Sequence, residues 1–215
     1  MQLLELFAGS CSISNVAKQH GIDTITTDVE AYDGIDIVSD ILSLDYKALN
    51  IQPTIIWASP PCTTFSIASC YVHYRYKDGK YIPITEAAKQ GIKFVLKTLE
   101  IIQYFKPKYW YIENPRGLLR RQRIMLNLPR TTVWYCKYND TRAKPTDIWT
   151  NNLCNLFNLK GWQPRPQCFN GNTKCHHEAA PRGSRTGTQG LKNNHERSKI
   201  PAALCIEIIE NLTQE

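Results

Sequence analysis

The strongest constraint on the fold of this 215-residue chain is a set of short apolar runs that stop at reactive residues. Residues 54–58 form one such run, which ends at Ser59-Pro60-Pro61-Cys62, and residues 109–112 form another, which ends at Glu113. Unbroken apolar runs of this length are typical of strands buried on both faces of a parallel sheet, and proline stops such a strand. Ligands gather at the carboxyl ends of parallel strands. The sequence therefore predicts a thiol and a carboxylate at one edge of a sheet.

Strand-like and helix-like patterns alternate along most of the chain, which predicts an α/β fold with a mostly parallel central sheet. The expected strands are 3–7, 24–27 (ending at Asp28), 54–58, 109–112, 131–136 and 147–150. The expected helices are 12–19 behind a serine cap, a short helix after Asp40, an amphipathic helix capped by Thr85 with apolar positions Ile92, Val95, Leu96, Leu99 and Ile102, and 199–212. A long loop is expected over residues 63–83.

The bulk composition limits the partners and the compartment. Lys and Arg number 26 against 19 Asp and Glu, a net charge of +7 that favours a polyanionic partner such as nucleic acid. No run reaches the length of a membrane span, and Met1 leads directly into a strand, so we expect no membrane partner and a cytoplasmic protein of a prokaryote or a virus-infected cell. In a reducing compartment the eight cysteines are expected to be free, buried or metal-bound.

Three motifs carry a family resemblance. Glu5-Leu6-Phe7-Ala8-Gly9, Pro60-Pro61-Cys62 and Glu113-Asn114 occur in this order, and together they resemble the DNA cytosine-5 methyltransferases. The resemblance implies a Rossmann-like, S-adenosylmethionine-dependent methyltransferase fold. It divides the chain into a catalytic core (1–150), a short basic Cys/His-containing insertion (151–195) in place of a larger target-recognition region, and a C-terminal helix (196–215) that packs back on the core. The chain would be a short, phage- or prokaryote-like member.

The resemblance assigns Cys62 as the nucleophile. Carbon 5 of cytosine is a weak nucleophile until a thiolate adds at carbon 6, and an ordinary cysteine is mostly protonated at neutral pH, so nearby positive charge or coupled proton transfer must help. Glu113 would protonate or hydrogen-bond ring nitrogen 3, which a raised pKa favours. Arg142 and Lys144, in a segment where the family has glutamine-x-arginine-x-arginine, would face the base and Glu113. A solvated turn is the alternative for the last two, and a small buried side chain is the alternative for Cys62.

The resemblance also assigns cofactor contacts. The loop after the first strand would hold the methionine part of S-adenosylmethionine, Asp28 would accept the ribose hydroxyls, and Asp40 would contact the adenine amino group. The full expected set is Phe7, Ala8, Gly9, Ser10, Asp28, Asp40, Pro60 and Ser198. A helix cap or a solvated turn is the alternative for each aspartate.

Aromatic and cationic residues interleave in the loop after Cys62, and in the family this loop closes over an extruded cytosine. Cations meet phosphates and aromatic rings stack on unpaired bases. The expected nucleic-acid contacts are Ser66, Tyr74, Arg75, Lys77, Arg182 and Arg185. The alternative is an ordinary surface loop. The basic insertion favours phosphate contacts, so we expect short or loose sequence specificity.

The insertion also carries Cys154, Cys168, Cys175, His176 and His177. The spacing of Cys168, Cys175 and His176 is not that of a standard zinc finger. We therefore expect cysteines packed in a loop-rich region and no metal, with zinc as the alternative.

The sequence as a whole predicts methyl transfer from S-adenosylmethionine to carbon 5 of cytosine in DNA, with base flipping. Cys11, Pro115 and Lys144 depart from the family pattern. Three alternatives stay open: an RNA cytosine methyltransferase, a catalytically silent nucleic-acid-binding relative, and an enzyme that uses the same thiolate addition with another electrophile. A restriction–modification role and protection of a viral genome are equally open.

Overall fold

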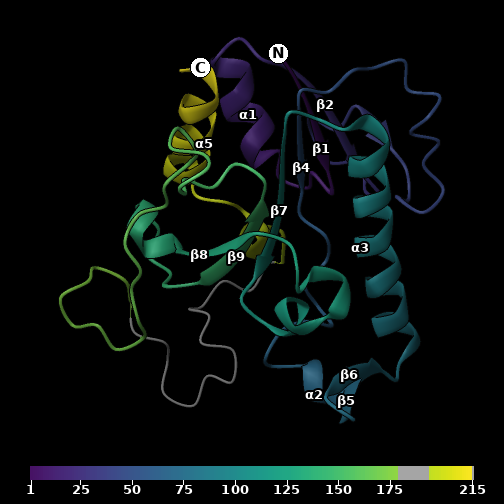
Figure 1. Cartoon of the computed structure of the whole chain (residues 1–215), viewed down its shortest axis with the longest axis vertical. Coiled ribbons are helices and arrows are strands. Elements are labelled where there is room, and N and C mark those ends of the chain that lie inside the picture. The colour runs from purple at the N-terminus through teal and green to yellow at the C-terminus, as the bar shows by residue number, and fades with distance from the viewer. Residues whose placement is uncertain (179–193, 215) are drawn as a thin grey trace.

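The computed structural model describes residues 1–178 and 194–214 (Figure 1). The strands in this part of the chain are β1 (Gln2–Leu6), β2 (Asp23–Asp28), β3 (Ile37–Val38), β4 (Ile55–Ala58), β5 (Tyr74–Lys77), β6 (Lys80–Pro83), β7 (Tyr109–Pro115), β8 (Arg130–Trp134) and β9 (Pro145–Thr150). The α-helices are α1 (Ser12–Gln19), α2 (Cys70–His73), α3 (Glu86–Phe105), α4 (Asn194–Ser198) and α5 (Ala202–Thr213). Three 3₁₀ turns complete the set: η1 (Leu118–Arg121), η2 (Arg123–Met125) and η3 (Tyr135–Tyr138).

The central sheet has the strand order β3-β2-β1-β4-β7-β9-β8. The first five strands in this order pair in parallel, whereas β9 runs antiparallel to both β7 and β8. The predicted α/β fold with a mostly parallel sheet is confirmed. The chain moves outward from β1 to β3 and then returns to the other side of β1 as β4, so the strand order reverses between β1 and β4.

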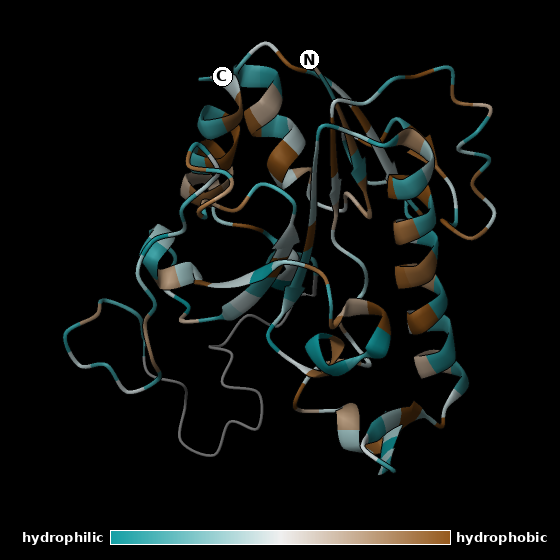
Figure 2. Cartoon of the chain, in the orientation of Figure 1, coloured by the Kyte–Doolittle hydropathy of each residue, from teal (hydrophilic) through white to brown (hydrophobic). Residues whose placement is uncertain are grey.

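Helices cover both faces of this sheet because its inner strands are apolar on both faces. Leu3, Ile55 and Trp57 point toward α1 and α5, and their neighbours in sequence, such as Leu4 and Ile56, point toward α3. Figure 1 shows α1 and α5 together on one side and α3 on the other, and Figure 2 shows hydrophobic residues along all three helices. The unbroken apolar runs in the sequence are the direct result of this two-sided burial.

Several local features differ from the sequence-based expectation. The segment after Asp40 is a turn rather than a helix, and the residue that caps α1 is Cys11, in a left-handed conformation, rather than a serine. The expected loop over 63–83 contains α2 and the antiparallel hairpin β5–β6. On α3, Leu96 is 46% exposed because the buried stripe runs through Ala88, Gly91, Val95, Thr98 and Ile101.

None of the helices in residues 1–178 and 194–214 has the length and apolar character that a membrane span requires.

Thr85 caps α3 as the sequence predicts: its Oγ1 accepts a hydrogen bond from the Ala88 backbone N–H at 3.2 Å. The same hydroxyl lies 2.8 Å from Nδ1 of His73, so the cap also ties the helix to α2. We expect Thr85→Ala to lower the free energy of unfolding by about 1 kcal/mol, because an N–H at the helix start loses its partner. Thr85→Ser keeps the hydroxyl and should retain most of the stability. Chemical denaturation of both variants measures this, and equal midpoints for the two would contradict it.

Candidate active site

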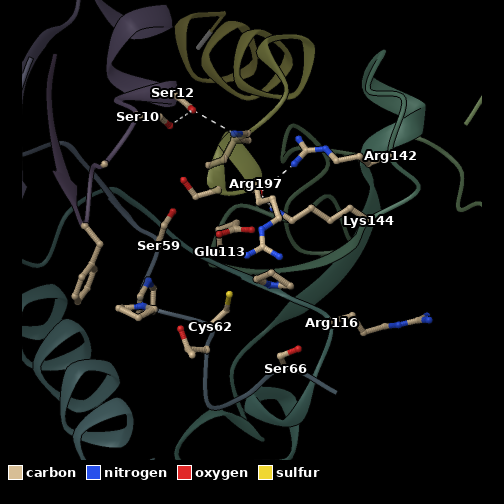
Figure 3. Close-up of a pocket in the computed structure, with 18 of the residues that line it drawn as sticks. Ser10, Ser12, Ser59, Cys62, Ser66, Glu113, Arg116, Arg142, Lys144 and Arg197 are labelled. Carbon is tan, nitrogen blue, oxygen red and sulfur yellow. Dashed lines mark hydrogen bonds between the residues drawn. The ribbon is translucent and has the colours of Figure 1, made fainter. Parts of the chain in front are cut away.

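A cavity of about 690 Å³ opens at the carboxyl ends of β1, β4 and β7, beside the point where the strand order reverses. This is where open α/β sheets bind their ligands. The lining comes from the segments that follow β1, β4 and β7, from the loop that leads into β9, and from the segment before α5. The residues are Glu5, 7–10, Ser12, 59–63, 66–69, Glu113, Pro115, Arg116, Arg142, Lys144, Pro145, Asn170, Arg197, Ser198 and Ile200. Figure 3 shows the side chains of Cys62, Glu113 and Arg197 turned toward a common space.

The loop that carries Cys62 is fixed to the end of β7. The buried Asn114 donates a hydrogen bond from Nδ2 to the Pro60 carbonyl at 2.8 Å. Further along, the Leu118 N–H donates to the Phe65 carbonyl at 2.7 Å, and a Cβ on Gly117 would lie only 2.3 Å from that oxygen. The backbone contact therefore requires glycine at 117. These contacts place the thiol of Cys62 beside the carboxylate that β7 carries.

Glu113 is a buried carboxyl group, only 5% exposed. The Tyr135 hydroxyl donates a hydrogen bond to its Oε1 at 3.0 Å. Burial raises the pKa of Glu113, and this effect outweighs the opposing influence of the Lys144 charge and of the hydrogen bond from Tyr135. A raised pKa suits a group that donates a proton or a hydrogen bond to a base.

Lys144 reaches the same cavity because β9 runs against β7, so that the residue before β9 lies beside the end of β7. Its ammonium donates a hydrogen bond to the Arg197 carbonyl at 2.9 Å and lies 4.6 Å from the centre of the Tyr135 ring. Burial lowers the pKa of Lys144, and the nearby Glu113 carboxylate opposes this shift. Lys144 is therefore the cation that acts on both Glu113 and Cys62.

The resting state of Cys62 follows from these neighbours. Burial raises the pKa of its thiol, and the Glu113 carboxylate raises it further, whereas Lys144 and Arg197 lower it. The net shift is upward, so Cys62 is a neutral thiol at neutral pH in the free protein. Of the two routes to a thiolate that the sequence left open, this favours loss of the proton coupled to attack.

Arg142 lines the cavity, but its guanidinium donates its hydrogen bonds to a carboxylate and two backbone carbonyls of the cavity wall. It pairs with Asp140, with an Nε–Oδ1 distance of 2.8 Å, and Nη1 and Nη2 donate to the carbonyls of Arg197 and Lys199 at 3.0 and 3.3 Å. Arg142 therefore ties the loop before β9 to the segment before α5. It shapes the cavity wall by holding these two segments together.

The other end of the cavity is the loop after β1. Phe7 and Gly9 have positive φ angles of 57° and 47°, so this loop turns sharply as it leaves the sheet. The Gly9 N–H donates to Oδ2 of Asp28 at 2.9 Å, while Oδ1 of Asp28 accepts from the Glu30 N–H at 3.0 Å. The Ser12 hydroxyl accepts from the Ile200 N–H at 3.2 Å, which closes this end against the segment before α5. The result is an open, backbone-lined wall continuous with Cys62, which fits a bound nucleoside cofactor.

Comparison with known proteins agrees with this geometry. A protein of Frog virus 3 (isolate Goorha), described as a probable DNA (cytosine-5)-methyltransferase, is 27% identical over 225 residues, which covers 98% of this chain and 99% of the viral protein. The chain is therefore similar, over nearly its whole length, to a protein described as a probable DNA (cytosine-5)-methyltransferase. This similarity agrees with the resemblance that the three motifs carry. No family model matches the chain.

Two solved methyltransferase structures are also similar to this chain. The Dnmt2 methyltransferase of S. pombe is 15% identical with a TM-score of 0.48, and a Spodoptera frugiperda DNMT2 mutant is 16% identical with a TM-score of 0.46. The similarities cover 70% and 81% of this chain but only 48% and 56% of those chains. The chain thus spans about half the length of these structures.

Most of the site residues expected from the sequence meet in this cavity. They are Phe7, Ala8, Gly9, Ser10, Pro60, Cys62, Ser66, Glu113, Arg142, Lys144 and Ser198. Asp28 and Asp40 do not line it among the described residues: Asp28 holds the loop after β1, and Oδ1 of Asp40 accepts from the Leu42 N–H at 2.9 Å. Their contacts with cofactor stay predictions.

The residues expected to contact nucleic acid fall into three groups: exposed, buried and outside the described residues. Arg75 and Lys77 lie on the exposed β5–β6 hairpin, outside the cavity lining. The expectation for Tyr74 is corrected: its side chain is 3% exposed and packs against Phe65, so its ring is not available to stack on a base. Arg182 and Arg185 lie outside the described residues.

The sequence reasoning missed three residues at this site: Glu5, Tyr135 and Arg197. Glu5 belongs to the first motif but reads as part of a strand, and Tyr135 follows β8 with no local pattern that links it to Glu113. Arg197 lies outside the three motifs that carry the resemblance. The available signals are an aromatic residue within the predicted strand 131–136 and a basic residue just before the predicted helix 199–212, and both are weak.

Glu5 provides a test by pH. It is 2% exposed, its Oε2 accepts a hydrogen bond from the Ser14 N–H at 3.1 Å, and burial raises its pKa from 4.5 to about 7. A raised pKa means that the protonated form is favoured on folding, so this contribution is fully present below pH 4.5 and is lost as the pH rises through about 7. We expect Glu5→Gln to remove a pH-dependent loss of about 3 kcal/mol from the free energy of unfolding.

Denaturation curves between pH 4 and 8 measure this effect. The exposed Glu30 is the matched control, because Glu30→Gln should leave the pH dependence unchanged. Parallel stability profiles for Glu5→Gln and the unchanged protein would contradict the assignment.

Lys144 is tested through the reactivity of Cys62. Replacing the ammonium by a neutral amide in Lys144→Gln removes a charge that lowers the thiol pKa, so the thiolate becomes rarer. We expect alkylation of Cys62 by iodoacetamide to slow several-fold, because the thiolate is the reacting form. Mass spectrometry of the Cys62 peptide separates it from the other cysteines. Lys80→Gln, on the exposed hairpin, is the control; equal rates for both variants would refute the role of Lys144.

Proposed function

We propose that this protein transfers a methyl group from S-adenosylmethionine to carbon 5 of cytosine in DNA, through a covalent bond between Cys62 and carbon 6 of the base. The observation that carries the proposal is the meeting of Cys62, Glu113 and Lys144 in one cavity that continues to the loop after β1. A nucleophile, an acid and a cation in one pocket are the groups that this addition needs.

Each residue has a role that its surroundings favour. Cys62 adds to carbon 6, and its proton leaves as the sulfur–carbon bond forms. The electron pair of the carbon 5–carbon 6 double bond shifts to join carbons 4 and 5, negative charge develops on ring nitrogen 3, and carbon 5 becomes nucleophilic. Glu113, whose pKa is raised by burial, donates to ring nitrogen 3 and stabilises the negative charge that develops there. Lys144 and Arg197 make it easier for the Cys62 thiol to lose its proton, because their positive charges stabilise negative charge on the sulfur. Once carbon 5 has taken the methyl group, a base removes the remaining carbon 5 proton, the carbon 5–carbon 6 double bond forms again, and the bond between carbon 6 and the Cys62 sulfur breaks.

Residues 7–10, Ser12, Pro60 and Ser198 would hold S-adenosylmethionine. This cofactor supplies an electrophilic methyl group. The sharp turn at Phe7 and Gly9 lets the backbone approach such a ligand closely, and the hydrogen bond from Gly9 to Asp28 holds the turn in place.

DNA is the proposed substrate for two reasons. The full-length viral relative is described as a probable DNA methyltransferase, and the net charge of +7 suits a polyanion. Exposed cations on the β5–β6 hairpin, such as Arg75 and Lys77, extend from the segment that follows Cys62 and would meet phosphates. Contacts of this kind carry no base information, so we propose short or loose sequence specificity.

The decisive test is covalent trapping. A duplex that contains 5-fluorocytosine keeps fluorine at carbon 5, so the enzyme cannot leave and stays attached to the methylated base. With labelled S-adenosylmethionine we expect a denaturation-resistant protein–DNA adduct that carries the label. Cys62→Ser should give no adduct and lose activity by on the order of a thousandfold or more, while it binds cofactor normally by calorimetry.

Cys70→Ser is the matched control, because Cys70 follows in the same segment but does not line the cavity among the described residues. It should form the adduct as the unchanged protein does. An adduct with the corresponding RNA but not with DNA would overturn the substrate assignment. No adduct with either, despite cofactor binding, would overturn the covalent mechanism and favour a silent binding protein.

A further inference from the structure

Four metal-binding side chains meet outside the active-site cavity. Cys136 lies in η3, directly after Tyr135, and Cys168, Cys175 and His177 come from the insertion. The three sulfur atoms and one ring nitrogen all lie within 4.8 Å of one another, and Cys168 Sγ is 3.8 Å from His177 Nδ1. Cys136 and Cys168 are buried, and the other two are half-buried.

This geometry is close to that of a tetrahedral metal site. With Zn–S bonds of about 2.3 Å and Zn–N bonds of about 2.1 Å, tetrahedral ligand atoms are separated by roughly 3.4 to 3.8 Å. The four atoms therefore need only small shifts to reach a common ion. Three sulfurs and one imidazole nitrogen form a ligand set that selects zinc over the harder cations.

The segment between Cys168 and Cys175 turns back so that its side-chain amide contacts the Cys168 sulfur. The Asn172 side-chain amide donates a hydrogen bond to the Cys168 sulfur at 3.4 Å, and the Cys175 N–H donates to the Asn172 carbonyl at 3.1 Å. Gly171, with a φ of 82°, provides the tight turn that returns the chain to Cys175. Amide donors to ligand sulfurs are the outer contacts that support thiolate–zinc sites.

We propose that Cys136, Cys168, Cys175 and His177 bind one structural zinc ion. The three thiols release their protons to solvent as they bind, and His177 binds through Nδ1 as a neutral imidazole. All four positions are filled by protein, which is the arrangement of a structural site rather than a catalytic one. The proposal takes the zinc alternative in place of the packed cysteines expected from the sequence: Cys154 and His176 lie outside the set, and Cys136 enters from the core, 32 residues before Cys168.

The proposed ion would fasten the insertion to the wall of the active site. The same segment already contacts the loop before β9: the Glu178 N–H donates to the Thr141 carbonyl at 2.9 Å, and His176 Nε2 lies 3.1 Å from the Asp140 carbonyl. That loop carries Arg142 and Lys144, and Cys136 adjoins Tyr135, the partner of Glu113. Zinc would thus stabilise the far side of the catalytic cavity without contacting the substrate.

Metal content of the purified full-length protein tests the proposal. After preparation under reducing conditions and gel filtration, we expect about one zinc ion per chain by elemental analysis. Cys136→Ser and Cys168→Ser should each reduce the content to below about a tenth. Cys154→Ser, in the same insertion but exposed and outside the cluster, should retain it. Replacement by Co²⁺ should give the sulfur-to-metal charge-transfer and intense d–d absorption bands of a tetrahedral, sulfur-rich site.

Measurements on the unchanged protein keep the proposal testable even if the serine variants do not fold. X-ray absorption at the zinc edge should give three sulfur neighbours and one nitrogen. Absence of zinc together with absence of cobalt bands would show a cluster of packed thiols, and a mass two hydrogens lower would show a disulfide; either result overturns the proposal. Zinc that is lost in Cys154→Ser but kept in both cluster variants would overturn it as well.

Discussion

The antiparallel pairing of β9 with β7 is the constraint on which the site depends. A strand that runs against its neighbour begins where that neighbour ends, so Thr146 of β9 lies opposite Pro115 at the end of β7. Lys144 is thereby brought beside Glu113, and Tyr135, which follows β8, reaches the same edge. A fully parallel sheet would place the residues before its last strand at the opposite edge. One reversal of strand direction thus combines two segments of the chain at one cavity.

Burial then determines the chemistry of the groups that this topology collects. Taking a carboxylate, an ammonium and a thiol out of water disfavours the charged form of each, which raises the pKa of Glu113 and of Cys62 and lowers that of Lys144. The Lys144 charge opposes the rise for Glu113 and for Cys62, whereas repulsion from the Glu113 carboxylate adds to the rise for Cys62. Cys62 is therefore a neutral thiol in the free protein, which protects it from unwanted reaction.

The sequence predicted the strands well, because a run of apolar residues ended by prolines has few alternatives. It also predicted the Thr85 cap, which depends on neighbouring residues alone. It missed the β5–β6 hairpin, and it assigned Tyr74 to nucleic acid although the ring is buried. Aromatic residues interleaved with cations fit an exposed binding loop and a half-buried hairpin equally well. Packing against Phe65, nine residues earlier, decides between the two.

By itself, then, the sequence determined that the sheet is mostly parallel and that Cys62 and Glu113 stand at one edge of it. These are consequences of local hydrophobicity and of proline geometry, both of which act over a few residues. Only the tertiary structure decided which distant groups face them: Tyr135 beside Glu113, the Arg197 carbonyl on Lys144, and Cys136 with the cysteines of the insertion. Such contacts join segments separated by tens of residues, and their partners are set by the direction in which each strand runs, which local spacing does not specify.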